Sequence, residues 1–162
     1  MTRIFPVNRF CHTQNLLRIL ADAFTTLSSG RKPSLAALLM ASGKEKVVAG
    51  HEPSTTNNRM ELRAAIEGLK AIKKKCRVKV VSDSLYVVKG MSEWMCSWKK
   101  TGFKNAKKQP IANADLWAQL LEISLLHEVT WQWVRGHAGD VLNERVDEIA
   151  REQAGLAQHQ LK

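Results

Sequence analysis

The stretch that decides the fold runs from Arg77 to Asp83 and reads RVKVVSD. Apolar Val78 and Val80 alternate with charged neighbours, and the pattern becomes apolar at Val81. Alternation with a period of two is typical of a strand, and the apolar end indicates entry into a core. Functional groups of α/β folds gather where strands leave the sheet, and a carboxylate is costly to bury there without a cation. Asp83 is therefore a candidate metal ligand.

Upstream of this strand the sequence predicts a β-hairpin and then a helix. Residues 36–40 and 45–49 flank a short Ser-Gly turn, which favours two antiparallel strands. Apolar residues then recur at helical spacing between Thr56 and Lys75, where Thr56 or Asn57 can cap the helix. The apolar positions are Leu62, Ala65, Ile66, Leu69 and Ile72.

Downstream the pattern continues with helices and one more strand. Two short helices are predicted over residues 84–89 and 92–100, and a longer helix over residues 113–126. Val129 to Val134 is rich in valine and tryptophan and predicts a strand, with Trp131 and Trp133 expected in the core. A last helix is expected over residues 143–154. The order of elements favours an α/β fold.

Composition narrows the class of partner. Lysine and arginine outnumber aspartate and glutamate by 25 to 15 over 162 residues, which gives a net charge of +10 and favours a polyanionic partner. No apolar run approaches the roughly 18 residues that a membrane span needs, so we expect a soluble protein without a membrane partner. The three widely spaced cysteines contain no CxxC pair and favour a reduced, cytoplasmic setting.

Two further acids stand out beside Asp83. Glu61 falls in the first turns of the predicted long helix, and Asp147 falls inside the last helix. Taken singly, Glu61 can simply favour a helix N-terminus and Asp147 can be a solvated residue. The sequence motifs around the three acids favour a shared functional role instead.

Four motifs occur in order along the chain. They are TTNNRMEL over residues 55–62, SDS over residues 82–84, WVRGHAG over residues 133–139 and NERVD over residues 143–147. With these motifs the chain closely resembles type 1 ribonuclease H, the bacterial kind, over roughly residues 36–152. The resemblance implies an α/β, ribonuclease H-like mixed five-stranded sheet flanked by helices. It also implies an endonuclease that hydrolyses the RNA strand of RNA/DNA hybrids with Mg²⁺ or Mn²⁺.

The resemblance assigns catalytic residues one by one. Glu61, Asp83 and Asp147 match three of the family's four metal-binding carboxylates, and His137 matches its mobile loop histidine. In the two-metal scheme, cations roughly 3.5–4 Å apart activate water and stabilise the leaving oxygen. Hard oxygen ligands suit Mg²⁺ and Mn²⁺.

The resemblance also assigns residues that contact the hybrid. Thr56, Asn57 and Asn58 match positions that touch its backbone, where hydroxyl and amide groups can read the 2′-hydroxyl. The basic segment, residues 98–108, has interleaved aromatic residues and resembles the family's basic protrusion, which lies against the DNA strand. The contacts expected from it and just before it are Trp94, Trp98, Lys99, Lys100 and Lys104. The alternative for the two tryptophans is that they hold a solvated loop to the core.

Residues 1–35 depart from the family. A first strand ending in aspartate and a glycine-rich turn are expected there, and the nearest candidate is the segment from Leu17 to Asp22 without such a turn. The same residues fit an amphipathic helix, which we favour slightly over a strand. We therefore divide the chain into a divergent N-terminal segment (1–35), a ribonuclease H-like domain (36–155) and a C-terminal tail (156–162).

Two functions follow from these observations. The first is an RNA/DNA hybrid endonuclease, expected to act as a monomer. The alternative is a catalytically impaired or inactive protein that binds RNA/DNA hybrids or double-stranded RNA. It is motivated by the same basic surface together with the unidentified first aspartate. Both predict binding that weakens with salt, but only the first predicts cleavage.

Overall fold

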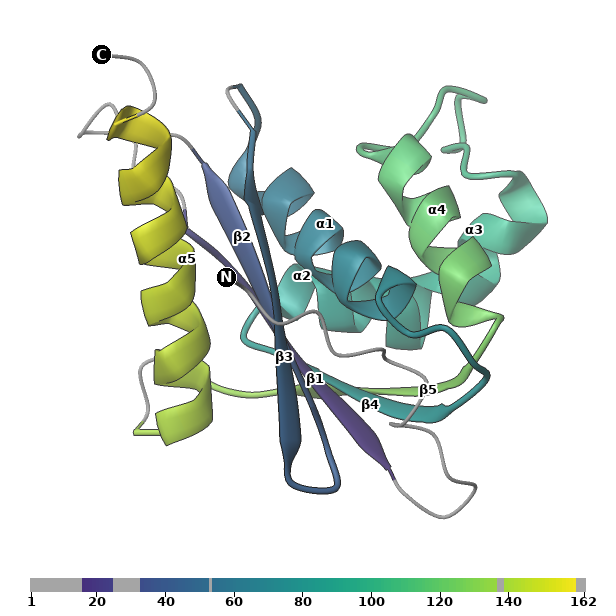
Figure 1. Cartoon of the computed structure of the whole chain (residues 1–162). Helices are drawn as coiled ribbons and strands as arrows, with labels where there is room; N and C mark the ends of the chain where they lie inside the picture. The colour runs from purple at the N-terminus through teal and green to yellow at the C-terminus, as the bar shows by residue number, and fades with distance from the viewer. Residues whose placement is uncertain (1–15, 25–32, 53, 137–138, 160–162) are drawn as a thin grey trace.

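The computed structural model describes residues 16–24, 33–52, 54–136 and 139–159. It contains five strands and a series of helices (Figure 1). The strands are β1 (Leu17–Phe24), β2 (Ser34–Ala41), β3 (Lys44–His51), β4 (Arg77–Ser82) and β5 (Glu128–Trp133). The helices are α1 (Asn57–Lys70), α2 (Leu85–Lys89), the π-helix η2 (Gly90–Trp94), α3 (Met95–Thr101), α4 (Ala114–Ser124) and α5 (Val141–His159).

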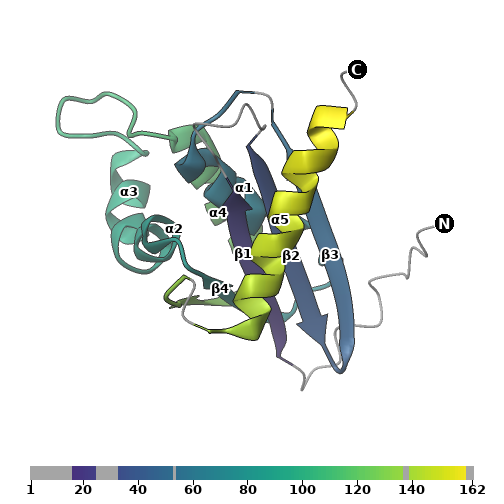
Figure 2. The same cartoon turned by 90° about the vertical axis from the view of Figure 1, so that its left-hand side faces the viewer.

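The strands form one mixed sheet in the order β3-β2-β1-β4-β5. β1 pairs antiparallel with β2 and parallel with β4, while β2–β3 is antiparallel and β4–β5 is parallel. Helix α5 covers one face of the sheet, and α1 covers the other with α4 beside it (Figures 1 and 2). The mixed five-stranded sheet flanked by helices is the fold that the sequence predicts.

The segment from Leu17 to Phe24 is the middle strand of the sheet, so our preference for a helix there was wrong. Its residues are bonded on both sides, and Ile19 is in register with Leu39 of β2 and Val80 of β4. Good helix formers such as leucine, arginine and alanine carry only fractions of a kcal/mol of preference per residue. Two ladders of backbone hydrogen bonds outweigh that preference.

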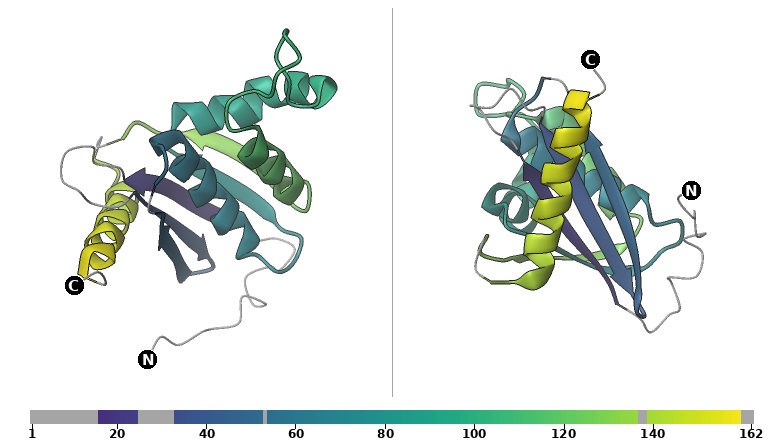
Figure 3. Two further views of the ribbon diagram at one scale, coloured as in Figure 1. Left: turned by 90° about the horizontal axis from the view of Figure 1, so that it is seen from above. Right: turned by 60° about the vertical axis from the view of Figure 1, so that its left-hand side comes forward.

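Helices on both faces of β1 explain why its sequence does not alternate cleanly. Leu17, Ile19 and Ala21 belong to the core beneath α1. Leu20 packs on the opposite face with Val146 of α5. A strand buried on both faces has apolar residues at odd and even positions, which cannot be told from a buried helix by periodicity. Figure 3 shows α5 running along one side of the sheet in two further views.

The other predicted elements are present with shifted ends. Ser42 and Gly43 form the turn between β2 and β3, both with positive φ (50° and 73°), which is the conformation that tight hairpins require. Thr56 caps α1, since its side chain accepts a hydrogen bond from the backbone of Arg59. The two short helices predicted after residue 84 are consecutive with η2 and make one helical run, from Leu85 to Thr101.

Two expectations about single residues fail. Trp133, expected in the core, is 45% exposed because it lies at the end of the outermost strand β5. Cys76 is disulfide-bonded, so the expectation of reduced cysteines is not met there, whereas Cys96 is free and exposed. Across the described residues we find no helix of the length and apolarity that crossing a membrane requires.

Candidate active site

Asp22 lies near the end of β1, on the middle strand of the sheet, and is only 7% exposed. Its carboxylate accepts a hydrogen bond from the backbone N–H of Ala23 (2.7 Å). Burial first, and then the negative charges of Asp83, Asp147 and Glu61, raise the pKa of Asp22 to about 8 against the lowering effect of that hydrogen bond. The four carboxylates therefore interact electrostatically across one region of the fold.

Asp83 comes directly after β4 and is placed beside Asp22 by strand register. Because β1 and β4 are parallel and Ala21 pairs with Ser82, the next residues of the two strands, Asp22 and Asp83, are neighbours. Asp22 is still in β1 and pairs with Ala36 of β2, whereas β4 ends just before Asp83. Trp133, at the end of β5, donates its indole N–H to the carbonyl oxygen of Asp83 (3.0 Å).

Gly136, just beyond β5, lies against the side chain of Asp83. A Cβ atom added at Gly136 would be 2.8 Å from Oδ2 of Asp83. Only a glycine fits at that position without displacing the carboxylate.

Glu61 approaches the same region from α1. Its carboxylate accepts hydrogen bonds from Asn57 Nδ2, one turn earlier, and from the hydroxyl of Ser84. Burial raises the pKa of Glu61 and so does the charge of Asp83, while the bonds from Ser84 and Asn57 lower it. Ser84 also caps α2 by accepting from the backbone N–H of Val87 (3.3 Å), so its hydroxyl links the end of β4, α2 and Glu61.

Asp147 comes from α5, on the opposite face of the sheet from α1. The residue is buried, and its Oδ2 lies 2.6 Å from Nη2 of Arg151, one turn later on the same helix. The side chain of Arg151 is 49% exposed. Arg151 therefore supplies a positive charge at the rim of the carboxylate cluster.

The donor chemistry of the four acids fits a hard divalent cation. Carboxylate oxygens are the ligands that Mg²⁺ and Mn²⁺ prefer, and a cation would relieve the crowding of charge that raises the pKa of Asp22. As the side chains lie, no three His, Cys, Asp or Glu residues of the described part of the chain are close enough together to hold a metal. Glu61 and Asp147 engage Ser84 and Arg151 instead. Binding of a metal therefore requires side chains to turn away from these partners. His137, predicted to assist, lies outside the described residues.

The predicted hybrid contacts at the start of α1 are exposed. Thr56, Asn57 and Asn58 all lie on the surface at the N-terminal end of the helix. Arg59 follows them and makes a two-pronged salt bridge to Asp115 of α4, with distances of 3.0 and 2.8 Å. This bridge ties the exposed end of α1 to the helix that follows the basic segment.

The basic segment rests on a cluster of aromatic rings. Trp98 lies between Trp94 and Trp117, with ring centroids 5.6 and 5.0 Å apart respectively. Trp117 is fully buried, as expected for a packing residue, and donates its indole N–H to the hydroxyl of Tyr86. Gly90 meets the face of this cluster, since an added Cβ would be 2.0 Å from the ring of Trp117.

The charged and apolar residues around that cluster are open to solvent. Lys99, Lys100 and Lys104 are exposed, and Trp94 is 37% exposed. Leu85, directly after Ser84, is 47% exposed. The surface around α2 and α3 therefore offers cations and apolar side chains together.

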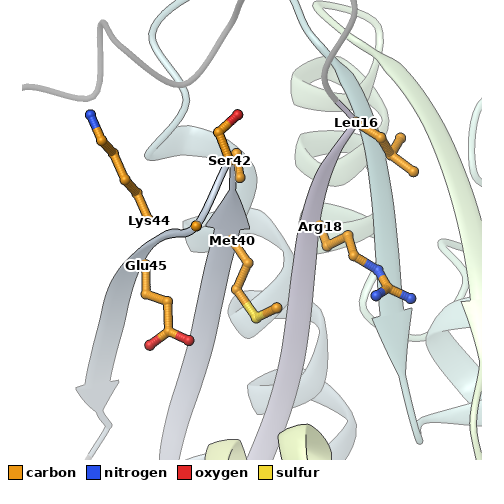
Figure 4. A pocket seen from close by; sticks show the side chains of 8 residues that line it. Leu16, Arg18, Met40, Ser42, Lys44 and Glu45 are labelled. Carbon is orange, nitrogen blue, oxygen red and sulfur yellow. The ribbon is translucent and has the colours of Figure 1, made fainter.

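Two hollows in the surface lie away from the carboxylates. One, of about 250 Å³, sits at the turn between β2 and β3 and is lined by Leu16, Arg18, Met40 and Glu45 among others. Leu16 stands at the opposite end of β1 from Asp22. Figure 4 shows Arg18 and Lys44 pointing away from each other, so the cations do not converge on a ligand. The second hollow, lined by Lys46 and Lys73 among others, contains none of the four acids either.

The sequence identified three of these acids and left the fourth open. For the fourth acid the sequence left two alternatives, Asp22 or no residue at all. Asp22 is favoured because it lies near the end of β1, which pairs with both β2 and β4. Ser84 and Arg151 were not singled out. Ser84 stood inside the SDS motif, and Arg151 is four residues after Asp147, the helical spacing of an ion pair.

Comparisons with known proteins agree with this geometry. The family model described as RNase H matches residues 20–155. A ribonuclease H of Pseudomonas fluorescens is 57% identical over 114 residues, which are 70% of this chain and 76% of that protein. A ribonuclease H of Pelobacter propionicus is 52% identical over 116 residues, covering 72% of this chain and 71% of that protein.

Solved structures give the same picture. LC9-RNase H1, a type 1 RNase H with the type 2 active-site motif, aligns with a TM-score of 0.76 and 34% identity, over 86% of this chain and 72% of its own. A foamy viral protease-reverse transcriptase in complex with RNA/DNA hybrid aligns with a TM-score of 0.64 over 95% of this chain and 21% of its own. At 16% identity that second likeness concerns the fold alone.

Proposed function

Because the chain belongs to the RNase H family, we propose that Asp22, Glu61, Asp83 and Asp147 form the catalytic centre of a ribonuclease that cuts the RNA strand of RNA/DNA hybrids. The observation that carries this proposal is the position of Asp22. It sits on the middle strand, beside Asp83, and it senses the charges of the other three acids. The alternative, an inactive binding protein, is motivated in part by an unidentified first carboxylate, and the position of Asp22 beside Asp83 supports catalysis over it.

Divalent metal, Mg²⁺ or Mn²⁺, is the proposed cofactor. Bound cations would supply activation of water and stabilisation of the leaving oxygen at phosphorus. The chain's own part is to hold the carboxylates in place. Gly136 keeps Asp83 from being displaced, while Ser84 and Asn57 fix Glu61 until a ligand takes their place. His137 is proposed to assist proton transfer or product release, as the resemblance implies.

The proposed hybrid-binding surface extends from the start of α1 to the basic segment. Thr56, Asn57 and Asn58 would contact the backbone near the carboxylates through hydroxyl and amide groups. Trp94, Trp98 and the lysines at 99, 100 and 104 would lie along the DNA strand, where cations neutralise phosphates. The packing of Trp98 between two other tryptophans favours a supporting role for this residue. A monomeric state and a cytoplasmic location stay predictions.

The test is cleavage of a labelled RNA/DNA hybrid by the purified protein with Mg²⁺ or Mn²⁺. Three variants accompany it: Asp22→Asn, Asp83→Asn and, as a control, Glu93→Gln, which changes an exposed acid of η2. We expect cleavage by the unmodified and Glu93→Gln proteins and a loss of at least about a hundredfold in the other two, since each removes a charge that holds the metal. Full activity of Asp22→Asn would overturn the placement of the first carboxylate. An inactive unmodified protein that still binds the hybrid would restore the binding-protein alternative.

A further inference from the structure

Arg151 forms an ion pair with Asp147, one of the carboxylates of the proposed catalytic centre. Its Nη2 is 2.6 Å from Oδ2 of Asp147, whose side chain is only 12% exposed. Other ion pairs of these residues, such as Arg145 with Glu45 and Arg59 with Asp115, involve acids outside the centre. The half-exposed Arg151 therefore places a positive charge on a buried acid of the proposed catalytic centre, where a metal would also bind.

We propose that Arg151 is a built-in counter-charge that stands in for the metal at Asp147 and that a divalent cation must compete with it for this carboxylate. The helix fixes this arrangement, because residues four apart on α5 lie on the same side, one turn from each other. Half of the Arg151 side chain already faces solvent, so the guanidinium can move outward without being buried elsewhere. Arg151 is thus a positioning residue that sets how tightly the centre binds metal.

The direction of the effect follows from charge. A metal and a guanidinium drawn to the same carboxylate repel each other, and the pair with arginine must be given up when the metal binds. Screening by solvent around the half-exposed arginine reduces this penalty. Removing the positive charge should therefore raise metal affinity by about three- to tenfold, which is the scale of a repulsion between near charges in a mostly aqueous setting.

The experiment compares two substitutions at Arg151 with a matched control. Arg151→Gln removes the charge but keeps a donor, whereas Arg151→Lys keeps the charge but loses the planar fork. Arg145→Gln removes a cation of the same helix whose partner, Glu45, lies on the hairpin. Affinity for Mn²⁺ and for Mg²⁺ is measured by titration calorimetry, and the melting temperature is recorded in chelator and in excess metal.

We expect Arg151→Gln to bind Mn²⁺ three- to tenfold more tightly, to melt lower than the unmodified protein in chelator and to gain more from added metal. Arg151→Lys and Arg145→Gln should bind like the unmodified protein. Unchanged or weaker binding by Arg151→Gln overturns the inference. This inference rests on the proposed catalytic centre, but the two fail differently. A protein that binds no metal in any form refutes the centre, whereas equal binding by all four proteins, with cleavage intact, refutes only the role of Arg151.

Discussion

The charge of Asp22 should make the metal-free protein less stable as pH rises, and Asp22→Asn should remove that loss. The pKa of Asp22 in the folded state is about 8, against an ordinary value of 3.8 for an aspartate in an unfolded chain. A raised pKa means that the folded state holds the proton more tightly than the unfolded chain. The stability that this proton confers is complete below pH 3.8 and is lost as pH rises to 8.

The magnitude follows from the gap between the two pKa values. Between pH 3.8 and pH 7 each pH unit costs the folded state about 1.4 kcal/mol, so the full effect at pH 7 is about 4 kcal/mol. Rearrangement of the neighbouring acids and entry of water reduce it, and we expect about 2 kcal/mol. For a chain of 162 residues this corresponds to a melting temperature about 4–8 °C higher in Asp22→Asn at pH 7.

The assay is thermal unfolding followed by circular dichroism, in chelator, from pH 4 to pH 9. The difference between Asp22→Asn and the unmodified protein should be near zero at pH 4, grow up to pH 8 and stay constant above it. Glu93→Gln, which changes an exposed acid, should follow the unmodified protein throughout. A difference that does not change with pH, or an unmodified protein that is the more stable of the two at pH 9, would refute the reasoning.

Three further substitutions test other contacts of the fold. Gly90→Ala should lower the free energy of unfolding by about 2–4 kcal/mol, because the added Cβ would overlap the ring of Trp117. Urea unfolding measures this free energy, and a decrease below about 0.5 kcal/mol would contradict the close packing. Gly136→Ala should leave the melting temperature nearly unchanged but reduce hybrid cleavage at least about tenfold, because the added carbon pushes Asp83 aside, and normal turnover would argue against that contact. Burial lowers the pKa of His127, so the unmodified protein should lose stability as pH falls through 6.5, and His127→Gln should lose less. The free energy of unfolding of both proteins is measured by chemical denaturation at pH 7 and pH 5. An equal loss in the two proteins between these pH values would exclude this role.

The sequence predicted the sheet and most helices because each of those elements carries a periodic pattern of its own. The hairpin had its Ser-Gly turn, α1 had its apolar stripe and capping threonine, and β4 had an alternating pattern that ended on an acid. The prediction for β1 was wrong because the stability of this strand comes from pairing with its two neighbours, β2 and β4. Apolar residues at 17, 19 and 21 alternate as in a strand, but Leu20 and Phe24 also give the segment the spacing of an amphipathic helix. Only pairing with β2 and β4 separates the two.

The candidate site was predictable to the extent that its residues belong to local motifs. Glu61, Asp83 and Asp147 each stand in a short run of recognisable residues. Contacts between segments that are distant in the sequence could not be predicted from these motifs. The approach of Gly136 to Asp83 and the bond from Ser84 to Glu61 depend on how the strands and α1 pack, which no local pattern states.

The place of β1 in the sheet also sets an order of events when the chain leaves the ribosome. β1 emerges first, yet its partners follow at very different times, since β2 ends at residue 41 and β4 only at residue 82. The antiparallel half of the sheet can therefore assemble while one edge of β1 still has no neighbour. Pairing over such long separations slows folding, and an unpaired edge invites contact with other nascent chains. Asp147, on α5, is synthesised after all five strands, so the four carboxylates can come together only when the chain is nearly complete.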